Sequence, residues 1–264
     1  MQSITEHCSI FTSSLYQTNS TVIDFGDKVL LVDPTWLPSE IDAIKSFIQE
    51  RYPNKALWIF ITHFDYDHVW GVPAFRDAHI ISPSLAGMED LGGKCLQQWQ
   101  QWDEEHYIKR AYPPILPIHE FVLFNNPTLL WGNNKLSFYH SPGHTPDSYC
   151  CIIEPEGILI AGDYLCDVEI PWIGTSIKEY KQSLLQFKDI INQHKITLCI
   201  PGHGSAIEGK DAILNRIEEG ISYLNLLSEQ NNEAETALQE LINQYPFPLA
   251  SREIHELNKK FISS

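Results

Sequence analysis

The sequence predicts an α/β fold, and three observations support this prediction. Apolar runs of strand length alternate with segments of helical periodicity along the 264 residues. No repeat, low-complexity tract or linker interrupts this alternation. Histidine and aspartate side chains follow the ends of several runs, where strands would stop. Strands mixed with helices without a boundary are typical of one α/β domain, which we expect over residues 1–264.

The first part of the chain reads as a sheet with a covering helix. Residues 21–34 contain two short strands joined at a Gly-Asp pair, which is typical of a hairpin. A helix is expected next, with Ser39 as its N-cap and an apolar face formed by Ile41, Ile44 and Ile48. Residues 56–63 and 77–82 then read as strands, the first of them covered on both faces.

Residues 84–118 differ in composition from their surroundings. They carry aromatic side chains among glutamine and glutamate: Trp99, Trp102, Tyr107 and Tyr112. We interpret this segment as an insertion that is helical in part and ends at prolines. Two roles stay open for it. It is either a hydrophobic lid over a binding site or a surface helix pair that packs its own tryptophans.

The second part of the chain returns to strands and then becomes helical. Strands are expected over residues 128–131, 135–140, 148–155, 157–163 and 196–204. Ser176 and Glu179 have the spacing of a capping box and predict a helix between the last two strands. Apolar residues at helical spacing predict a helical tail over 206–264.

Composition and charge argue against several classes of partner. The 18 basic residues are spread among 34 acidic ones, and the net charge is −16, whereas nucleic-acid binding needs clustered lysine and arginine. No run approaches the ~20 apolar residues of a membrane span. The first residues lack an export signal, and the six cysteines lack metal-site spacing. We therefore expect a cytoplasmic protein with a small-molecule substrate, and a homodimer stays open.

The residues "FITHFDYDHVWG" (60–71) carry the strongest functional signal. Within six positions they hold two histidines and two aspartates: His63, Asp65, Asp67 and His68. Three later strand ends add imidazole or carboxylate in the turns "SPGHTPDS", "AGD" and "PGHG", namely His144, Asp163 and His203. Imidazole and carboxylate are the usual protein ligands of zinc, iron and manganese. If the strand ends converge on one rim, these side chains predict a metal centre.

These motifs, in this order, resemble the metallo-beta-lactamase fold superfamily over residues 20–205. The resemblance implies a four-layer αββα sandwich with two divalent metal ions between the sheet edges. It implies one ion at His63 and His144, the other at Asp67, His68 and His203, and a bridge at Asp163. Ligating histidines usually need their second ring nitrogen held, and we expect Asp33, Thr62 and Thr145 to do this.

Asp65 departs from the superfamily, most of which has histidine at this position. Asp65 is either a bystander or a carboxylate ligand in place of imidazole. As a ligand it makes the centre less positive, because carboxylates at 65, 67 and 163 and one hydroxide balance two divalent cations. A carboxylate is expected to help iron or manganese to compete with zinc.

Hydrolysis is the leading functional hypothesis, with a small ester, lactone or thioester as substrate. Two metal ions would acidify a water and stabilise the developing oxyanion. Asp67 is expected to keep the second ion in place, and Tyr164, next to Asp163, either donates to the oxyanion or is a core tyrosine. Two alternatives stay open. One is iron oxygen chemistry of the persulfide dioxygenase or flavodiiron type, and the other is a binding module on a degenerate fold.

Overall fold

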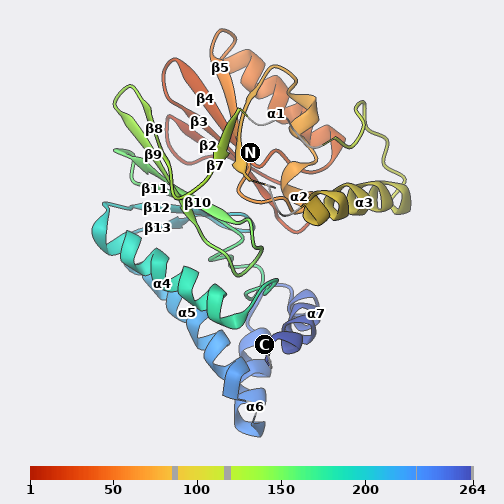
Figure 1. Cartoon of the computed structure of the whole chain (residues 1–264), viewed down its shortest axis with the longest axis vertical. Helices are drawn as coiled ribbons and strands as arrows, with labels where there is room; N and C mark the ends of the chain where they lie inside the picture. The colour runs from red at the N-terminus through yellow and green to blue at the C-terminus, as the bar shows by residue number, and fades with distance from the viewer. Residues whose placement is uncertain (85–88, 116–119, 230, 263–264) are drawn as a thin grey trace. The chain divides into compact units, whose positions relative to one another are not determined.

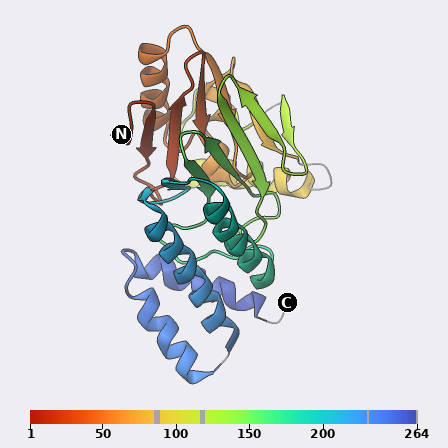
Figure 2. The ribbon, with the colours of Figure 1, turned by 90° about the vertical axis from the view of Figure 1, so that its left-hand side faces the viewer.

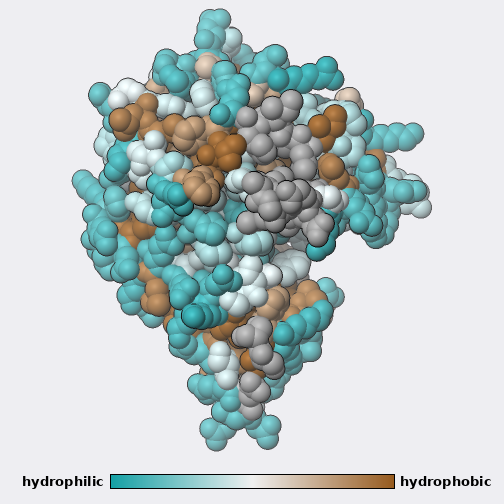
Figure 3. Space-filling model, viewed as in Figure 1, coloured by the Kyte–Doolittle hydropathy of each residue, from teal (hydrophilic) through white to brown (hydrophobic). Residues whose placement is uncertain are grey.

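The computed structural model describes residues 1–84, 89–115, 120–229 and 231–262. The chain divides into two compact units, Met1–Asn125 and Asn126–Ser264. The described part contains two sheets and seven α-helices (Figure 1). The predicted α/β class is therefore confirmed, while the single-domain boundary stays a prediction. No described helix is long and apolar enough to cross a membrane. On the face drawn in Figure 3, hydrophilic residues surround smaller hydrophobic patches.

Unit 1 is built on a seven-stranded sheet in which the strands lie in chain order. The strands are β1 (Gln2–Ser3), β2 (Cys8–Thr12), β3 (Asn19–Asp24), β4 (Lys28–Val32), β5 (Ala56–Phe60), β6 (His79–Pro83) and β7 (Phe121–Leu123). Pairing is antiparallel from β1 to β4 and parallel from β4 to β7. The predicted hairpin is confirmed, with Gly26 at φ +88° in its turn. Strands β1, β2 and β7 were missed, because polar residues interrupt the first two and β7 is only three residues long.

The parallel pair of β4 and β5 brings two polar segments side by side. Val32 pairs with Phe60, so both strands end at the same level of the sheet. The backbone N–H of Asp33 then donates to the Phe60 carbonyl over 3.0 Å. Because carboxyl ends of parallel strands meet at one edge, Asp33 lies beside the segment that leads to His63.

Helix α1 (Pro38–Arg51) buries the three predicted isoleucines against β4 and β5. Its N-terminus corrects the sequence-based prediction. The helix begins at Pro38, two residues earlier than a Ser39 cap predicts, with Leu37 as the N-cap and proline in the first turn. Proline needs no hydrogen-bond acceptor there, so the start is favourable without a serine cap. The Glu40 carboxylate accepts from the Leu37 N–H (3.1 Å) and also from the Ser14 N–H (2.9 Å).

The insertion packs its tryptophans into unit 1. Helix α3 (Glu89–Glu105) buries Trp99 against Trp70, with ring centroids 5.7 Å apart, and places Trp102 4.7 Å from Trp36. Trp70 directly follows the short helix α2 (Tyr66–Val69). The structure therefore agrees better with a helix that packs its tryptophans than with a lid. The tryptophans of α3 pack against Trp36 and Trp70, which lie outside the insertion. Positions 85–88 and 116–118 of this insertion lie outside the described residues.

Arg110 holds this aromatic cluster together. Its guanidinium lies 5.1 Å from the Trp70 ring centroid and 5.8 Å from that of Trp99. It also makes a two-pronged hydrogen bond to Asp103 (2.7 and 2.9 Å) and donates to the Trp36 carbonyl (2.7 Å). Its side chain is 2% exposed, so all these contacts are desolvated.

Arg110→Met is therefore expected to lower the free energy of unfolding by about 3 kcal/mol, because it leaves a partly buried carboxylate without its cation. Urea unfolding followed by tryptophan fluorescence measures this. Arg51→Met removes an exposed arginine from the same unit and is the matched control. Equal midpoints for the two variants would show that the Arg110 contacts contribute nothing net.

Unit 2 is built on a six-stranded sheet with the order β13-β12-β11-β10-β9-β8. The strands are β8 (Thr128–Trp131), β9 (Asn134–His140), β10 (Tyr149–Glu154), β11 (Ile158–Gly162), β12 (Leu198–Pro201) and β13 (Ile207–Glu208). The helices are α4 (Ile177–Gln193), α5 (Lys210–Glu229), α6 (Asn232–Ile242) and α7 (Pro248–Asn258). Helices α4 and α5 run side by side (Figure 2) and bury their apolar faces with the sheet in one core. The predicted cap is confirmed, since Ser176 Oγ accepts from the Glu179 N–H (3.2 Å).

All six cysteines of the chain are buried thiols. Cys150 and Cys151 are adjacent on β10 and point to opposite faces, yet both are fully buried, so both faces of this strand are covered. Burial raises the pKa of the Cys8 and Cys150 thiols to about 12. These thiols therefore stay protonated at neutral pH and behave as small apolar side chains.

Candidate metal centre

In unit 1, a chain of hydrogen bonds fixes the tautomer of His63. The Thr62 hydroxyl lies 2.7 Å from Asp33 Oδ2 and 2.9 Å from His63 Nδ1. A carboxylate can only accept, so the hydroxyl donates to Asp33 and its oxygen accepts the Nδ1–H of His63. In the neutral ring, the lone pair is then on Nε2. This is the nitrogen that a metal ion would bind.

Asp33 fixes a second histidine in the same way. Its Oδ2 lies 3.0 Å from His68 Nδ1, and its Oδ1 accepts from the Thr62 N–H over 2.8 Å. His68 therefore also carries its lone pair on Nε2. Asp33 is 2% exposed and has φ +46°, a left-handed conformation that aspartate tolerates better than most residues. The predicted anchoring roles of Asp33 and Thr62 are confirmed.

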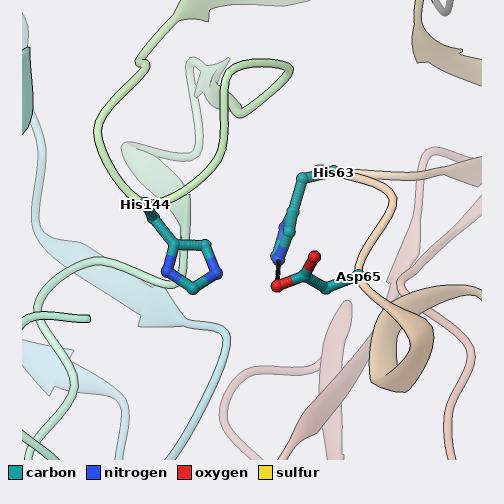
Figure 4. A group of neighbouring side chains, drawn as sticks. All are labelled: His63, Asp65 and His144. Atoms are coloured by element: carbon teal, nitrogen blue, oxygen red, sulfur yellow. Dashed lines mark ion pairs between the residues drawn. The ribbon is translucent and has the colours of Figure 1, made fainter. Parts of the chain in front are cut away.

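Each of these histidines faces a carboxylate of the same loop. Asp65, the N-cap residue of α2, places Oδ2 3.7 Å from His63 Nε2, as the dashed line in Figure 4 shows. Asp67 places Oδ2 3.5 Å from His68 Nε2 and also accepts from the Thr18 hydroxyl (3.3 Å). Two atoms that bind one ion at about 2.1 Å lie roughly 3.0–3.4 Å apart. Both pairs are therefore close to the spacing of ligands on a common ion.

In unit 2, one carboxylate oxygen faces two histidines. Asp163, directly after β11, places Oδ2 3.2 Å from Nε2 of His144 and 3.2 Å from Nε2 of His203. His144, also drawn in Figure 4, points its Nδ1 at the Trp172 carbonyl (3.0 Å). Because a carbonyl only accepts, Nδ1 carries the proton and Nε2 the lone pair. These distances suit a carboxylate that binds a cation together with each of the two imidazoles.

The loop that carries His144 is held by close backbone contacts. Gly143 has φ +137°, and a Cβ there would lie 2.3 Å from the Tyr180 Cα. The Tyr164 hydroxyl donates to the Ser141 carbonyl (2.9 Å) and accepts from the His144 N–H (3.1 Å). Tyr164 is 1% exposed, and burial raises the pKa of its hydroxyl well above the usual range. This geometry favours the core interpretation of Tyr164, and its catalytic role stays a prediction.

Two features of the site escaped the sequence-based interpretation, and one expectation was wrong. Glu169 offers a carboxylate oxygen within 4.8 Å of ligand atoms of Asp163 and His203, although it belongs to no motif. The anchor of His144 is a backbone carbonyl, which leaves no mark in the sequence. Thr145, expected to anchor a histidine, bonds instead to the Ser148 hydroxyl over 2.6 Å, so that expectation was wrong.

The donor chemistry of both units fits divalent cations. Each of the four histidines has Nε2 within 3.7 Å of a carboxylate oxygen. For His63, His68 and His144 the hydrogen bonds at Nδ1 leave a lone pair on that Nε2. A lone pair that faces a carboxylate is repulsive unless a metal ion or a proton lies between them, and the three carboxylates here belong to partly or fully buried side chains. Nitrogen and oxygen donors of this kind suit zinc, iron and manganese.

Comparisons with known proteins agree with this chemistry. Residues 14–203 match the profile of the metallo-beta-lactamase superfamily. A metallo-beta-lactamase type 2 of Bacillus sp. (strain 170) is 21% identical over 211 residues, which cover 79% of this chain and 74% of the relative. An atrochrysone carboxyl ACP thioesterase of Emericella nidulans is 24% identical over 191 residues, which cover 72% of this chain but only 52% of the relative.

The solved structures agree on the fold. A metallo-beta-lactamase family protein of Thermus thermophilus superposes with a TM-score of 0.64 at 18% sequence identity. The match covers 96% of this chain and 93% of that protein. The fold that the sequence motifs implied is therefore confirmed, with the helical tail included in the matched length.

Proposed function

This chain belongs to the metallo-beta-lactamase superfamily, and from that premise we propose that it is a hydrolase that depends on two divalent metal ions. The observation that carries the proposal is the fixed tautomer of three histidines. Protein hydrogen bonds at Nδ1 leave Nε2 of His63, His68 and His144 with a lone pair beside a carboxylate. Side chains prepared in this way are typical of metal sites.

We assign the ligands by motif, since all of them lie within the matched residues 14–203. One ion would be held by His63, Asp65 and His144, the other by Asp67, His68 and His203, with Asp163 shared between the two ions. When bound, the ions would supply an acidified water as nucleophile and a Lewis acid for the carbonyl oxygen. The chain itself holds the ligands: Asp33 and Thr62 orient two rings, and the Trp172 carbonyl orients a third.

The proposed substrate is a small ester, lactone or thioester. The names of two relatives, a metallo-beta-lactamase and an ACP thioesterase, support acyl transfer to water. The net charge of −16 and the lack of a basic run argue against nucleic acid and against an anionic membrane surface as partners. The test is elemental analysis of the purified chain combined with a panel of ester, lactone, thioester and phosphodiester substrates. One iron per chain without hydrolysis would instead favour the iron oxygenase alternative.

Asp65→His is expected to raise zinc occupancy relative to iron, because imidazole is the softer ligand and removes one negative charge. The measurement is metal content after reconstitution in equal concentrations of zinc and iron. Asp77→His, at an exposed position of the same unit, is the matched control. The same zinc-to-iron ratio in both variants would show that Asp65 does not bind the ion.

A further inference from the structure

The C-terminal helix holds a segment that contacts a proposed metal ligand. Asn258, the last residue of α7, is fully buried. Its Nδ2 donates to the Pro171 carbonyl over 2.6 Å, and its Oδ1 accepts from the Ile173 N–H over 2.9 Å. One amide therefore binds the backbone on both sides of Trp172. Only one orientation of the amide satisfies both bonds, since the carbonyl needs a donor and the N–H an acceptor.

Asn258 is itself fixed by a buried polar network in the tail. Its Nδ2 also donates to the Tyr223 hydroxyl (2.9 Å), which lies 3.1 Å from His255 Nδ1. The hydroxyl accepts from the amide and also forms a hydrogen bond with His255. All three side chains are fully buried. Breaking either of these buried bonds would leave a desolvated polar group, so the network holds the Asn258 amide in place.

Trp172 connects this network to His144. Its carbonyl accepts the Nδ1–H of His144, while its indole is 41% exposed and makes an edge contact with the His144 ring. The next residues add backbone contacts to the same loop. The Gly174 N–H donates to the Gly143 carbonyl (2.9 Å), and a Cβ on Gly174 would lie 2.1 Å from the His144 carbonyl oxygen. The segment from Pro171 to Gly174 therefore lies directly against the His144 loop.

We propose that Asn258 is a positioning residue for His144. By fixing Pro171 and Ile173, it keeps the Trp172 carbonyl on Nδ1 of His144, which reserves Nε2 for a cation. Asn258 lies outside the superfamily match of residues 14–203, so this role would extend the site into the tail. The inference rests on the proposed function in one respect, namely that His144 binds metal.

Asn258→Asp tests the first step without metal. Aspartate keeps the shape and the acceptor for the Ile173 N–H, but places an oxygen against the Pro171 carbonyl. Side-chain ¹⁵N NMR of the chelated full chain reports the tautomer of His144, whose signals are assigned from their loss in His144→Gln. We expect the Nδ1–H form in the wild type and a mixture of tautomers in Asn258→Asp. Asn232→Asp makes the same chemical change at an exposed tail position and should leave the His144 signals unchanged.

Metal affinity tests the second step. Zn²⁺ titration against a competing chelator should show affinity about tenfold weaker in Asn258→Asp than in the wild type or in Asn232→Asp. In a His144→Ala background the same substitution should cause no further loss, because its effect passes through His144. Equal losses in both backgrounds, or an unchanged His144 tautomer, would overturn the proposal.

Two precautions keep the outcome interpretable. If Asn258→Asp does not fold, Tyr223→Phe removes only the hydroxyl that holds the amide, and a smaller shift of the His144 signals in the same direction is expected. A wild-type chain that binds no metal would overturn the proposed function. The NMR measurement on the metal-free chain would still decide whether Asn258 positions His144.

Discussion

Asp163→Asn is expected to lower metal content to one ion or none and to reduce turnover by more than 100-fold. Asp163 Oδ2 lies 3.2 Å from Nε2 of both His144 and His203, so one carboxylate oxygen faces both imidazole rings. The neutral amide loses the charge that balances the cations. Loss of residues that only support metal ligands already costs roughly 10–100-fold, so loss of a shared ligand should cost more.

The control for this variant is Asp211→Asn, which removes an exposed carboxylate from the same unit. Elemental analysis and hydrolysis of the best substrate are measured on both variants, together with thermal unfolding. If Asp163→Asn retained two ions and wild-type turnover, Asp163 could not be a shared ligand. A similar loss of metal ions and turnover in Asp211→Asn would show that the effect comes from the change in net charge and not from the position of Asp163.

Asp33→Asn is expected to weaken both histidine positions of unit 1 at once. Asp33 accepts three hydrogen bonds, from the Thr62 N–H, the Thr62 hydroxyl and His68 Nδ1–H. An amide in its place has only one acceptor oxygen, so its NH₂ group would meet another donor. We expect metal affinity to fall by about 10–100-fold and the free energy of unfolding to fall by about 3 kcal/mol.

Chelator competition and urea unfolding measure these two effects separately. Asp27→Asn, in the exposed turn between β3 and β4, makes the same substitution without buried partners and should leave both values unchanged. Thr62→Val removes the hydroxyl that holds His63 Nδ1 but keeps the bond between Asp33 and His68. It should therefore lower metal affinity less than Asp33→Asn. If Thr62→Val and Asp33→Asn had equal effects, the bond to His68 would contribute nothing.

The sequence predicted the elements whose signals are local. The strand over 128–131 was predicted with its observed bounds because a proline and a glycine enclose a short apolar run. The cap at Ser176 was confirmed for a similar reason, since its partner lies three residues away. The start of α1 was predicted two residues too late, because Ser39 was taken as the cap while Pro38 at the first helical position and the Glu40 carboxylate on the Leu37 N–H mark the observed start. The further bonds of Glu40 to Ser13 and Ser14 come from far away in the chain and leave no local pattern.

The site shows the same limit. His63, His68 and their carboxylates lie on one turn, so their spacing alone indicated a metal-binding loop. Asp33 and Thr62 could be expected, because both side chains lie where neighbouring strands end. The Trp172 carbonyl and the Asn258 amide could not be expected. Any residue supplies a carbonyl, and residues 172 and 258 become neighbours only through the folding of unit 2.

The buried cysteines give this chain an internal reporter of opening. The thiolate is the form that alkylating reagents attack, and burial both hides the sulfur and raises the pKa of several of these thiols. Iodoacetamide should therefore modify a cysteine only during local or global unfolding. Cys8 and Cys95 report on unit 1, and the remaining four, Cys150, Cys151, Cys166 and Cys199, report on unit 2. Peptide mass spectrometry after timed labelling would thus show, without any engineered cysteine, which of the two units a bound cation protects.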